Sequence, residues 1–457
     1  MWYAPVEKNE EQVIETVELM KKLGLNALYI QTWDGGETIY PTQNELTRQS
    51  ARFEGFDVLG SFVEHCHEAD IEVHAWVHNF FIGTTAAMSD PEHITVKMKE
   101  HHLVSRSGTP YNPTGYGNFV FLDPYTRECR DFVLDLYREM LSRYELDGLH
   151  LDYIRFPEPN DYSDTARDDF GYNADIIAAF AAETGIQTDP HDIYPGTQYW
   201  SEWCKFREEI INSFVGEIYD LVREVRNSAA ITCAVFPDLE VTSTTIFQNS
   251  GVWLDNGWID ELFTMAYSTS VDYIVNNTVS FADVVGKNAF YSVGLGAFME
   301  FDEYLYIKEV EAVRELWVDG TAIFSLASVD GNKLGNYIAQ SVHRKPAVRT
   351  DRLEVTLSAQ LNSLIDRCDG IFALSGASEQ ELSGLSSQLE GVLELCRPVD
   401  RDNADDICRF VDEAVAALES VDTSFANEEF GKVLEAEIGE CVDCLIRSRN
   451  IYTRRAG

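Results

Sequence analysis

The stretch DGLHLDYIRFP at residues 147–157 is the most informative part of this 457-residue chain. Successive side chains of a β-strand point to opposite faces, so Leu149 and Leu151 share one face and His150 and Asp152 share the other. The leucines suit packing against helices, whereas a carboxylate buried among apolar groups is costly unless it has a partner. The pattern predicts a strand that carries two polar side chains into a functional site.

Strand-like and helix-like segments alternate on both sides of this stretch. Eight strands are expected, at Trp2–Ala4, Asn26–Trp33, Ile71–Phe81, Asp147–Phe156, Ala230–Phe236, Glu261–Tyr267, Ala289–Phe298 and Thr321–Ser328. Repeated strand–helix units pair in parallel, and eight of them predict an α/β fold, the (β/α)8 TIM barrel, rather than an open doubly wound sheet. The active site of such a barrel forms at the C-terminal ends of its strands.

The pattern changes near residue 345. Four helix-like segments follow without strand signals, at Arg352–Cys368, Glu379–Cys396, Asp402–Ser420 and Glu428–Arg447. We therefore expect a barrel over residues 1–345 and a C-terminal all-helical module over residues 346–457. Within the barrel, the turn-rich segment 84–120 is too long for a simple connector and is expected to be a functional loop.

The composition is strongly acidic, with 35 basic against 77 acidic residues and a formal net charge of −42. Nucleic acids and anionic lipid surfaces attract Lys and Arg, so the charge excludes both as partners. No run of 18 or more apolar residues predicts membrane insertion. The N-terminal residues do not resemble a signal peptide, which predicts a cytoplasmic protein as written, or an extracytoplasmic one if a leader has been removed.

Neither a metal nor a cofactor is expected. The nine cysteines are scattered and odd in number, so they form no disulfide framework. Cys441 and Cys444 make a lone CxxC pair without the further two ligands that a structural zinc site needs. Gly294-Leu295-Gly296 lacks the third glycine of a dinucleotide-binding turn.

Carboxylates and aromatic residues recur where the expected strands end. Aromatic faces stack on the C–H faces of sugar rings while polar groups meet the hydroxyls, so this mixture is typical of sugar binding. The candidate substrate-binding residues are Trp33, Glu37, Tyr40, Trp76, His78, His150, Tyr153, Arg155 and Tyr267. Besides Asp152, the candidate carboxylates are Asp238 after the fifth strand and Glu300 after the seventh.

The stretch 147–157 resembles the fourth-strand signature of the glycosyl-hydrolase-like family 10 proteins, which often reads DG[IV]H[FL]D followed by aromatic residues and Pro. GLNALYIQTWDGGETIYPT at residues 24–42 and EVHAWVHN at residues 72–79 are similar to two further regions of that family. The likeness extends over most of residues 1–340. The chain departs from the family pattern at Trp33, where the family commonly has Arg, and at Glu37, where it often has Asp.

The resemblance implies a barrel glycosidase that acts on a bacterial or environmental glycan, with peptidoglycan-derived glycan as the first expectation and a plant polysaccharide or exopolysaccharide as the second. In related barrels an Asp at the end of the fourth strand often serves as nucleophile, which would be Asp152. Glycoside hydrolysis generally needs two carboxyl groups. Asp238 is the first candidate for the second group and Glu300 the next.

Two other functions remain open. A metal-dependent hydrolase could use the inward histidines, but His74 and His78 lie about 13 Å apart along a strand, too far to share one metal ion. Alternatively, the chain is a non-catalytic glycan-binding or scaffold barrel. In either case the C-terminal helices are expected to offer a surface for a protein partner or another copy of the chain.

Overall fold

The fold was analysed in a computed structural model of the chain. It describes residues 1–165, 167–299, 303–316, 318–329, 333–344, 347–348, 352–368, 370–400 and 403–456.

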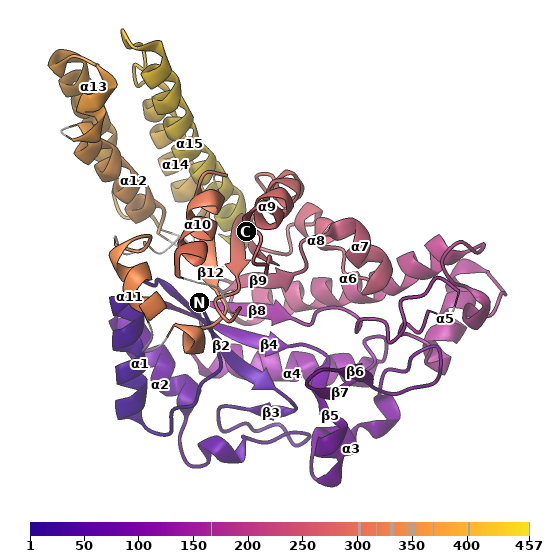
Figure 1. The fold of residues 1–457 in the computed structure, drawn as a ribbon. Helices are drawn as coiled ribbons and strands as arrows, with labels where there is room; N and C mark the ends of the chain where they lie inside the picture. Colours follow the sequence, from indigo (N-terminus) through magenta and orange to yellow (C-terminus); the bar gives the residue numbers. More distant parts are fainter. Residues whose placement is uncertain are drawn as a thin grey trace.

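Eight parallel strands form a nearly closed barrel, as the sequence predicts (Figure 1). In their order around the barrel they are β1 (Trp2–Tyr3), β2 (Ala27–Asp34), β4 (Glu72–His78), β8 (Gly148–Asp152), β9 (Ala230–Val235), β10 (Glu261–Met265), β11 (Phe290–Leu295) and β12 (Gly320–Ile323). A parallel bridge between Trp2 and Phe324 brings the last strand back to the first.

The interior of the barrel is filled by side chains and is not a pore. Trp2, Tyr29, Trp76 and Phe263 form an inner cluster with small alanines between them. Such large rings fit only where a neighbouring strand has a residue without a side chain. A Cβ at Gly148 would lie 2.2 Å from Nδ1 of His74, so only glycine fits there.

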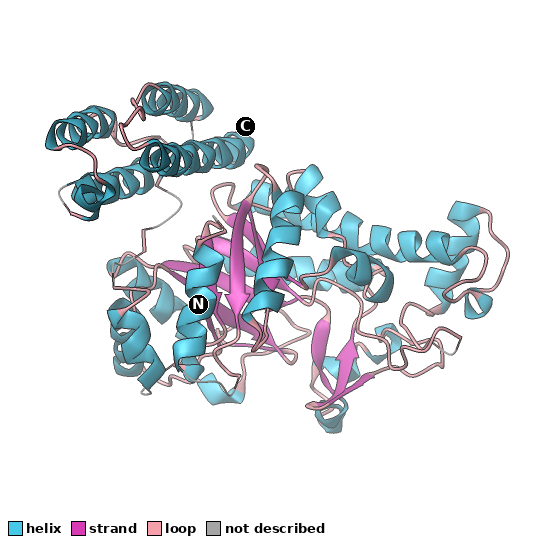
Figure 2. Ribbon diagram, turned by 45° about the horizontal axis from the view of Figure 1, so that its top comes forward, coloured by secondary structure: helices cyan, strands magenta, loops and turns pink. Residues whose placement is uncertain are grey.

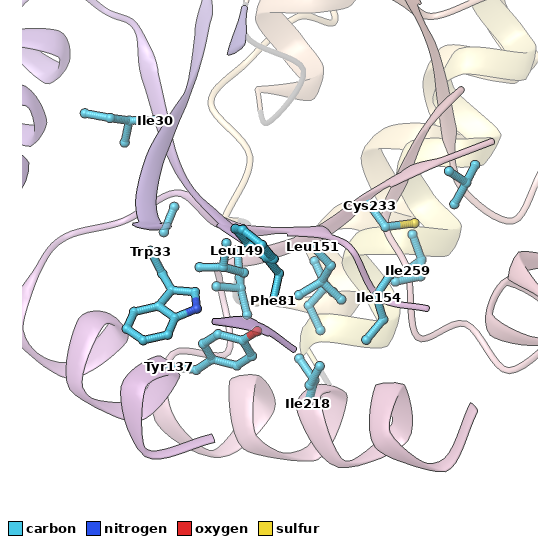
Figure 3. Close-up of a cluster of buried hydrophobic side chains, with 14 of the residues drawn as sticks. Ile30, Trp33, Phe81, Tyr137, Leu149, Leu151, Ile154, Ile218, Cys233 and Ile259 are labelled. Atoms are coloured by element: carbon cyan, nitrogen blue, oxygen red, sulfur yellow. The ribbon is translucent and has the colours of Figure 1, made fainter. Parts of the chain in front are cut away.

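The outer layer lies between the strands and the surrounding helices. These helices are α1 (Glu10–Lys22), α2 (Val58–Glu68), α4 (Arg127–Arg143), α6 (Trp200–Val225), α8 (Ser250–Asp255), α9 (Val271–Val285), α10 (Glu303–Arg314) and α11 (Lys333–Gln340). Figure 3 shows Leu149 and Leu151 of β8 directed toward Tyr137 of α4 and Ile218 of α6. Both leucines are fully buried, so the alternation predicted for this strand is confirmed.

Four predicted strands extend too far; they were expected to end at Phe81, Phe156, Phe298 and Ser328, but they end at His78, Asp152, Leu295 and Ile323. The strand expected to reach Phe156 ends at Asp152, because Tyr153 adopts a left-handed backbone conformation with φ 51° that breaks the extended run. The strand expected to reach Ser328 ends at Ile323 and is followed by a 3-10 turn at Leu326–Ser328.

The long connections at the C-terminal end of the barrel are partly ordered into elements of their own. Segment 84–120, expected to be a loop, contributes to a three-stranded antiparallel sheet of β5 (Phe81–Thr84), β6 (Asn112–Thr114) and β7 (Gly117–Phe121), with the short helix α3 (Ile94–Lys97) beside it. The helices α5 (Ala174–Thr184) and α7 (Leu239–Thr245) follow β8 and β9, and β3 (Glu37–Thr38) forms a hairpin with β2.

Four helices pack side by side at the C-terminal end of the chain (Figure 2). They are α12 (Leu353–Cys368), α13 (Glu379–Leu393), α14 (Ala404–Glu419) and α15 (Glu428–Ala456). Their leucine-rich faces make a hydrophobic cluster of their own that also includes Phe290 of β11. The expected domain boundary at 345/346 lies outside the described residues. None of the described helices has the length and apolar character that a bilayer crossing would need.

Candidate active site

Asp152 is the last residue of β8 and lies at the C-terminal end of the barrel. The indole Nε1 of Trp76 donates to its Oδ2 at 3.1 Å, and the backbone N–H of Tyr153 donates to its Oδ1 at 2.7 Å. The guanidinium of Arg155 lies 3.4 Å from Oδ1, and the whole Asp152 residue is only 7% exposed. Donors on both oxygens fix the orientation of this carboxylate and balance the cost of burying its charge.

Tyr153 and Arg155 form a layered arrangement beside this carboxylate. The Arg155 guanidinium lies 4.3 Å from the ring centre of Tyr153 and 4.9 Å from that of Phe236, which are cation–π distances. The Tyr153 ring in turn stacks on Phe81, with ring centres 5.6 Å apart. A left-handed backbone at a bulky residue such as Tyr153 is uncommon and marks a constrained site.

His78, at the end of β4, links Asp152 to a second carboxylate. Its Nδ1 lies 3.0 Å from Oδ1 of Asp34, and its Nε2 lies 3.8 Å from Oδ2 of Asp152. Burial alone would raise the pKa of Asp34, but the hydrogen bond and charge of His78 outweigh it, so the pKa lies below the usual value. Asp34 is therefore ionised at neutral pH.

Asp34 is a site residue that the sequence reasoning missed. It ends β2 and is followed by Gly35 and Gly36, both with positive φ, in the turn to β3. A carboxylate at the end of a barrel strand, before a glycine turn, was the available signal. Only the contact with His78 distinguishes it from the other acidic residues of that turn.

Tyr267 lies close to Asp152 across the barrel mouth. Its ring packs against Phe298 and Phe324 with ring centres 5.5 and 5.4 Å away. Burial raises the pKa of Tyr267 well above its usual value, and the negative charge of Asp152 adds to the effect. The hydroxyl therefore stays protonated at neutral pH and can donate a hydrogen bond.

Trp33, a predicted substrate-binding residue, faces the outer layer instead of the barrel mouth. The pairing of β2 with β4 shifts register between Gln31 and Trp33, so Trp33 is opposite Val77, which points to the helices. The Trp33 ring is 2% exposed and packs on Phe132 of α4. Figure 3 shows it in the outer layer beside Tyr137. One extra residue in a strand moves the following side chain to the other face.

Tyr40 and His150 are also too buried to meet a substrate. Tyr40 is fully buried in the outer layer, where it packs on Tyr144. His150 is fully buried in the barrel interior, where Trp2 Nε1 donates to its Nε2 at 2.9 Å and its Nδ1 lies 2.8 Å from the Thr232 hydroxyl. An indole can only donate, so the other nitrogen carries the proton, and burial holds the pKa of His150 well below its usual value.

Of the two candidates for a second catalytic carboxylate, only Asp238 is among the described residues. Asp238 is exposed and is the N-cap of α7, where its carboxylate accepts the backbone N–H of Val241 at 3.0 Å. That contact is structural, and no described contact joins Asp238 to Asp152. Glu300 lies outside the described residues. Glu37, on β3, forms an ion pair with Arg48 at 2.9 Å and lines a small cavity beside Asp34.

The inward histidines have partners other than a shared metal ion. Nε2 of His74 lies 3.0 Å from Glu72 at the opposite end of the barrel from Asp152, and His78 contacts Asp34. Among the described residues, no group of three or more His, Cys, Asp or Glu side chains could hold a metal ion. Burial raises the pKa of both Cys441 and Cys444 to about 12, so neither is a thiolate at neutral pH.

Comparison with known proteins agrees with the barrel fold. The model of one protein family, described as Glycosyl hydrolase-like 10, matches residues 1–288. That range contains every described residue around Asp152 except those contributed by the last two strands and their loops.

Two curated relatives match about a third of the chain. Glycosyl hydrolase YngK of Bacillus subtilis is 26% identical over 157 residues, which is 33% of this chain and 29% of that protein. Glycosyl hydrolase DigH of Escherichia coli K12 is 22% identical over 155 residues, 33% of this chain and 35% of that protein. The aligned part thus spans only about a third of the length of these relatives.

Among solved structures, the catalytic domain of a beta-amylase from Paenibacillus polymyxa shares the fold. It superposes with a TM-score of 0.52 at 12% identity, covering 76% of this chain and 99% of that one. At this identity the likeness concerns the barrel alone.

Proposed function

This chain belongs to the glycosyl hydrolase-like 10 family, and on that premise we propose that it hydrolyses O-glycosidic bonds of a glycan at the C-terminal end of its barrel. The proposal rests on the position and contacts of Asp152. It is a buried carboxylate at the end of β8, oriented by Trp76, Tyr153 and Arg155, in the place where barrels of this kind carry catalytic groups.

Asp152 is the proposed nucleophile, or the charge that stabilises the oxocarbenium-like transition state. A fixed carboxylate suits either role, because it needs no reorganisation as positive charge develops on the sugar. The Tyr267 hydroxyl, kept protonated beside it, is the proposed hydrogen-bond donor to the sugar.

The reaction also needs a group that delivers a proton to the leaving oxygen. His78 is our candidate, because its imidazole lies between two carboxylates, Asp34 at 3.0 Å and Asp152 at 3.8 Å. Asp238 and Glu300, the carboxylates suggested by the sequence, remain proposals for the same role. The cap contact of Asp238 with Val241 argues against it.

The proposed substrate is a polysaccharide or peptidoglycan-type glycan. The net charge of −42 makes a strongly anionic polymer a poor partner, so neutral or weakly charged chains are favoured. The C-terminal helices are proposed as a surface for a protein partner or a second copy of the chain.

The test measures hydrolysis of a panel of glycans by the release of reducing ends. The panel contains peptide-free peptidoglycan strands, chitin and cellulose oligosaccharides, and a bacterial exopolysaccharide. We expect the wild-type chain to cleave at least one of them and Asp152→Asn to lose the activity while its thermal unfolding stays near wild type. Hydrolysis that survives in Asp152→Asn would refute the catalytic assignment. Binding of glycans without any cleavage would instead identify a glycan-binding barrel.

A further inference from the structure

A small cavity of about 210 Å³ lies at the C-terminal end of the barrel, between β2, its hairpin with β3 and the segment that carries Ser50 and Arg52. Its polar lining includes Gln31, Asp34, Glu37 and Arg52. Pro5 and Ile39 supply apolar wall. Glu37 is the one lining residue that the sequence predicts to bind substrate, and the mechanism above uses only Asp34.

Asp34 joins this cavity to the catalytic groups. Its Oδ1 lies 3.0 Å from Nδ1 of His78, yet 39% of its side chain is exposed, so a ligand can reach the carboxylate. The Gln31 amide, which also lines the cavity, lies 3.4 Å from Nε2 of the same imidazole. Two walls of the cavity therefore contact the histidine that faces Asp152.

The chemistry of the lining suits one sugar ring. Carboxylates accept hydrogen bonds from hydroxyls, an amide does both, and a guanidinium donates to ring or hydroxyl oxygens. The apolar Pro5 and Ile39 can contact the C–H face of a pyranose. The lining carries two carboxylates, Asp34 and Glu37, and one guanidinium, Arg52, so the wall of the cavity has one more formal negative charge than positive.

We propose that this cavity is a subsite for one uncharged sugar unit of the glycan that is cleaved at Asp152. The inference rests on the proposed function and adds the chemical class of one bound unit. A uronic acid or another acidic sugar in this position would be repelled by Asp34, whereas a neutral hexose or an N-acetylhexosamine would not. A chain that alternates neutral and acidic units is then bound in one register.

The kinetic test uses Asp34→Asn and Arg52→Gln, with Glu54→Gln as a matched control on the exposed loop after Arg52. We expect Arg52→Gln to raise KM for a cleaved neutral oligosaccharide about tenfold and to leave kcat near wild type, since it removes a donor to the bound ring. Asp34→Asn should raise KM and also lower kcat, because it releases His78. Glu54→Gln should change neither.

A binding experiment separates this subsite from the proposed hydrolysis. The probes are chitotetraose and cellotetraose, added to the Asp152→Asn chain, and the readout is the imidazole NMR signals of His78, assigned with a His78→Gln variant. A His78 shift that Arg52→Gln weakens supports the subsite even if the wild-type chain cleaves nothing. Hydrolysis with unchanged KM in both cavity variants, or no His78 shift with either probe at saturation, would overturn the subsite.

Discussion

The two ends of the barrel both carry buried carboxylates, but these meet different partners. At the N-terminal end, aspartates that immediately precede strands accept the backbone N–H group of the second residue of the neighbouring strand. The contacts, each 2.8 Å long, are Asp147 with Val73, Asp260 with Ile231 and Asp319 with Tyr291. At the C-terminal end, Asp152 accepts from side chains and from the next residue and lies near an open cavity.

Helix α15 completes the N-terminal end. Arg455 forms an ion pair with Asp260 at 3.0 Å, and Arg447 forms one with Asp319 at 2.7 Å. Burial alone would raise the pKa of Asp260, but Arg455 and Arg223 outweigh it and keep the pKa below its usual value. The arginines that satisfy these carboxylates come from another part of the chain and cover them.

In this fold, the partners of a buried carboxylate distinguish a structural residue from one in the proposed active site. Burial does not separate them, since Asp260 is 4% exposed and Asp152 is 7% exposed. The partners do, because each of these N-terminal aspartates accepts a backbone N–H group, and Asp260 and Asp319 also pair with arginines of α15. Asp152 and Asp34 instead share an imidazole that can hold a proton.

The largest expected effect is a contrast between Asp152→Asn and Asp260→Asn. Asp152→Asn should lower kcat on the cleaved glycan by about 1000-fold or more, as expected for a catalytic group, with a small change in stability. Asp260→Asn should leave kcat within about twofold and lower the free energy of unfolding. Glycan hydrolysis measures kcat of the two variants, and urea unfolding measures their free energy of unfolding. A comparable loss of kcat in Asp260→Asn would erase the distinction between the ends.

Arg455→Met tests the covering helix. It leaves the buried carboxylate of Asp260 without its closest cation, which should cost about 3 kcal/mol of unfolding free energy. Adding Asp260→Asn should recover part of that loss, because the uncompensated charge is gone. Urea unfolding of the single and double variants measures the coupling. Strictly additive losses would show that the pair is not a unit.

The fold followed from the sequence more readily than the site did. Period-two alternation at Leu149 and Leu151, repeated with helices between, was enough for the barrel. Trp33 could not be placed, because the bulge that turns it outward comes from pairing between β2 and β4. Its alternation within the strand gave no sign of this.

The alternation of side chains along a strand also does not predict which partners those side chains contact. His150 and Asp152 both point inward, but the contacts of His150 with Trp2 and Thr232 make it structural. Asp34 gains its significance from an imidazole 44 residues later in the chain. The docking of α15 was missed because the helix was expected to end at Arg447, before Arg454 and Arg455.

Glu261 gives a pH-dependent test of the N-terminal end. Burial raises its pKa from 4.5 to about 7, although Ser292 donates to it and His74 lies nearby. Between these pH values the unfolded chain loses a proton that the folded chain keeps, so stability falls as the pH rises. Glu261→Gln should therefore be more stable than wild type by about 2 kcal/mol at pH 8 and no different at pH 4.

Thermal unfolding at several pH values measures this difference. A stabilisation of equal size at pH 4 and pH 8 would mean that ionisation of Glu261 is not its cause.

The smallest expected effects come from two tryptophans. Trp33→Phe should cost about 1 kcal/mol of stability through looser packing on Phe132 and leave KM unchanged. Trp76→Phe should instead lower kcat, because it removes the indole donor to Asp152. Steady-state kinetics of both variants on the same glycan separates them. A raised KM in Trp33→Phe would return that residue to the binding site.

The central claim is that glycan binds at the C-terminal end of the barrel, around Asp152. Hydrogen–deuterium exchange of the Asp152→Asn chain, with and without saturating chitotetraose, tests it without depending on turnover. We expect slower exchange in peptides that contain Gln31–Asp34, His78 and Tyr153–Arg155, and no change in α15. Slower exchange confined to α15 and the N-terminal ends of the strands would contradict it.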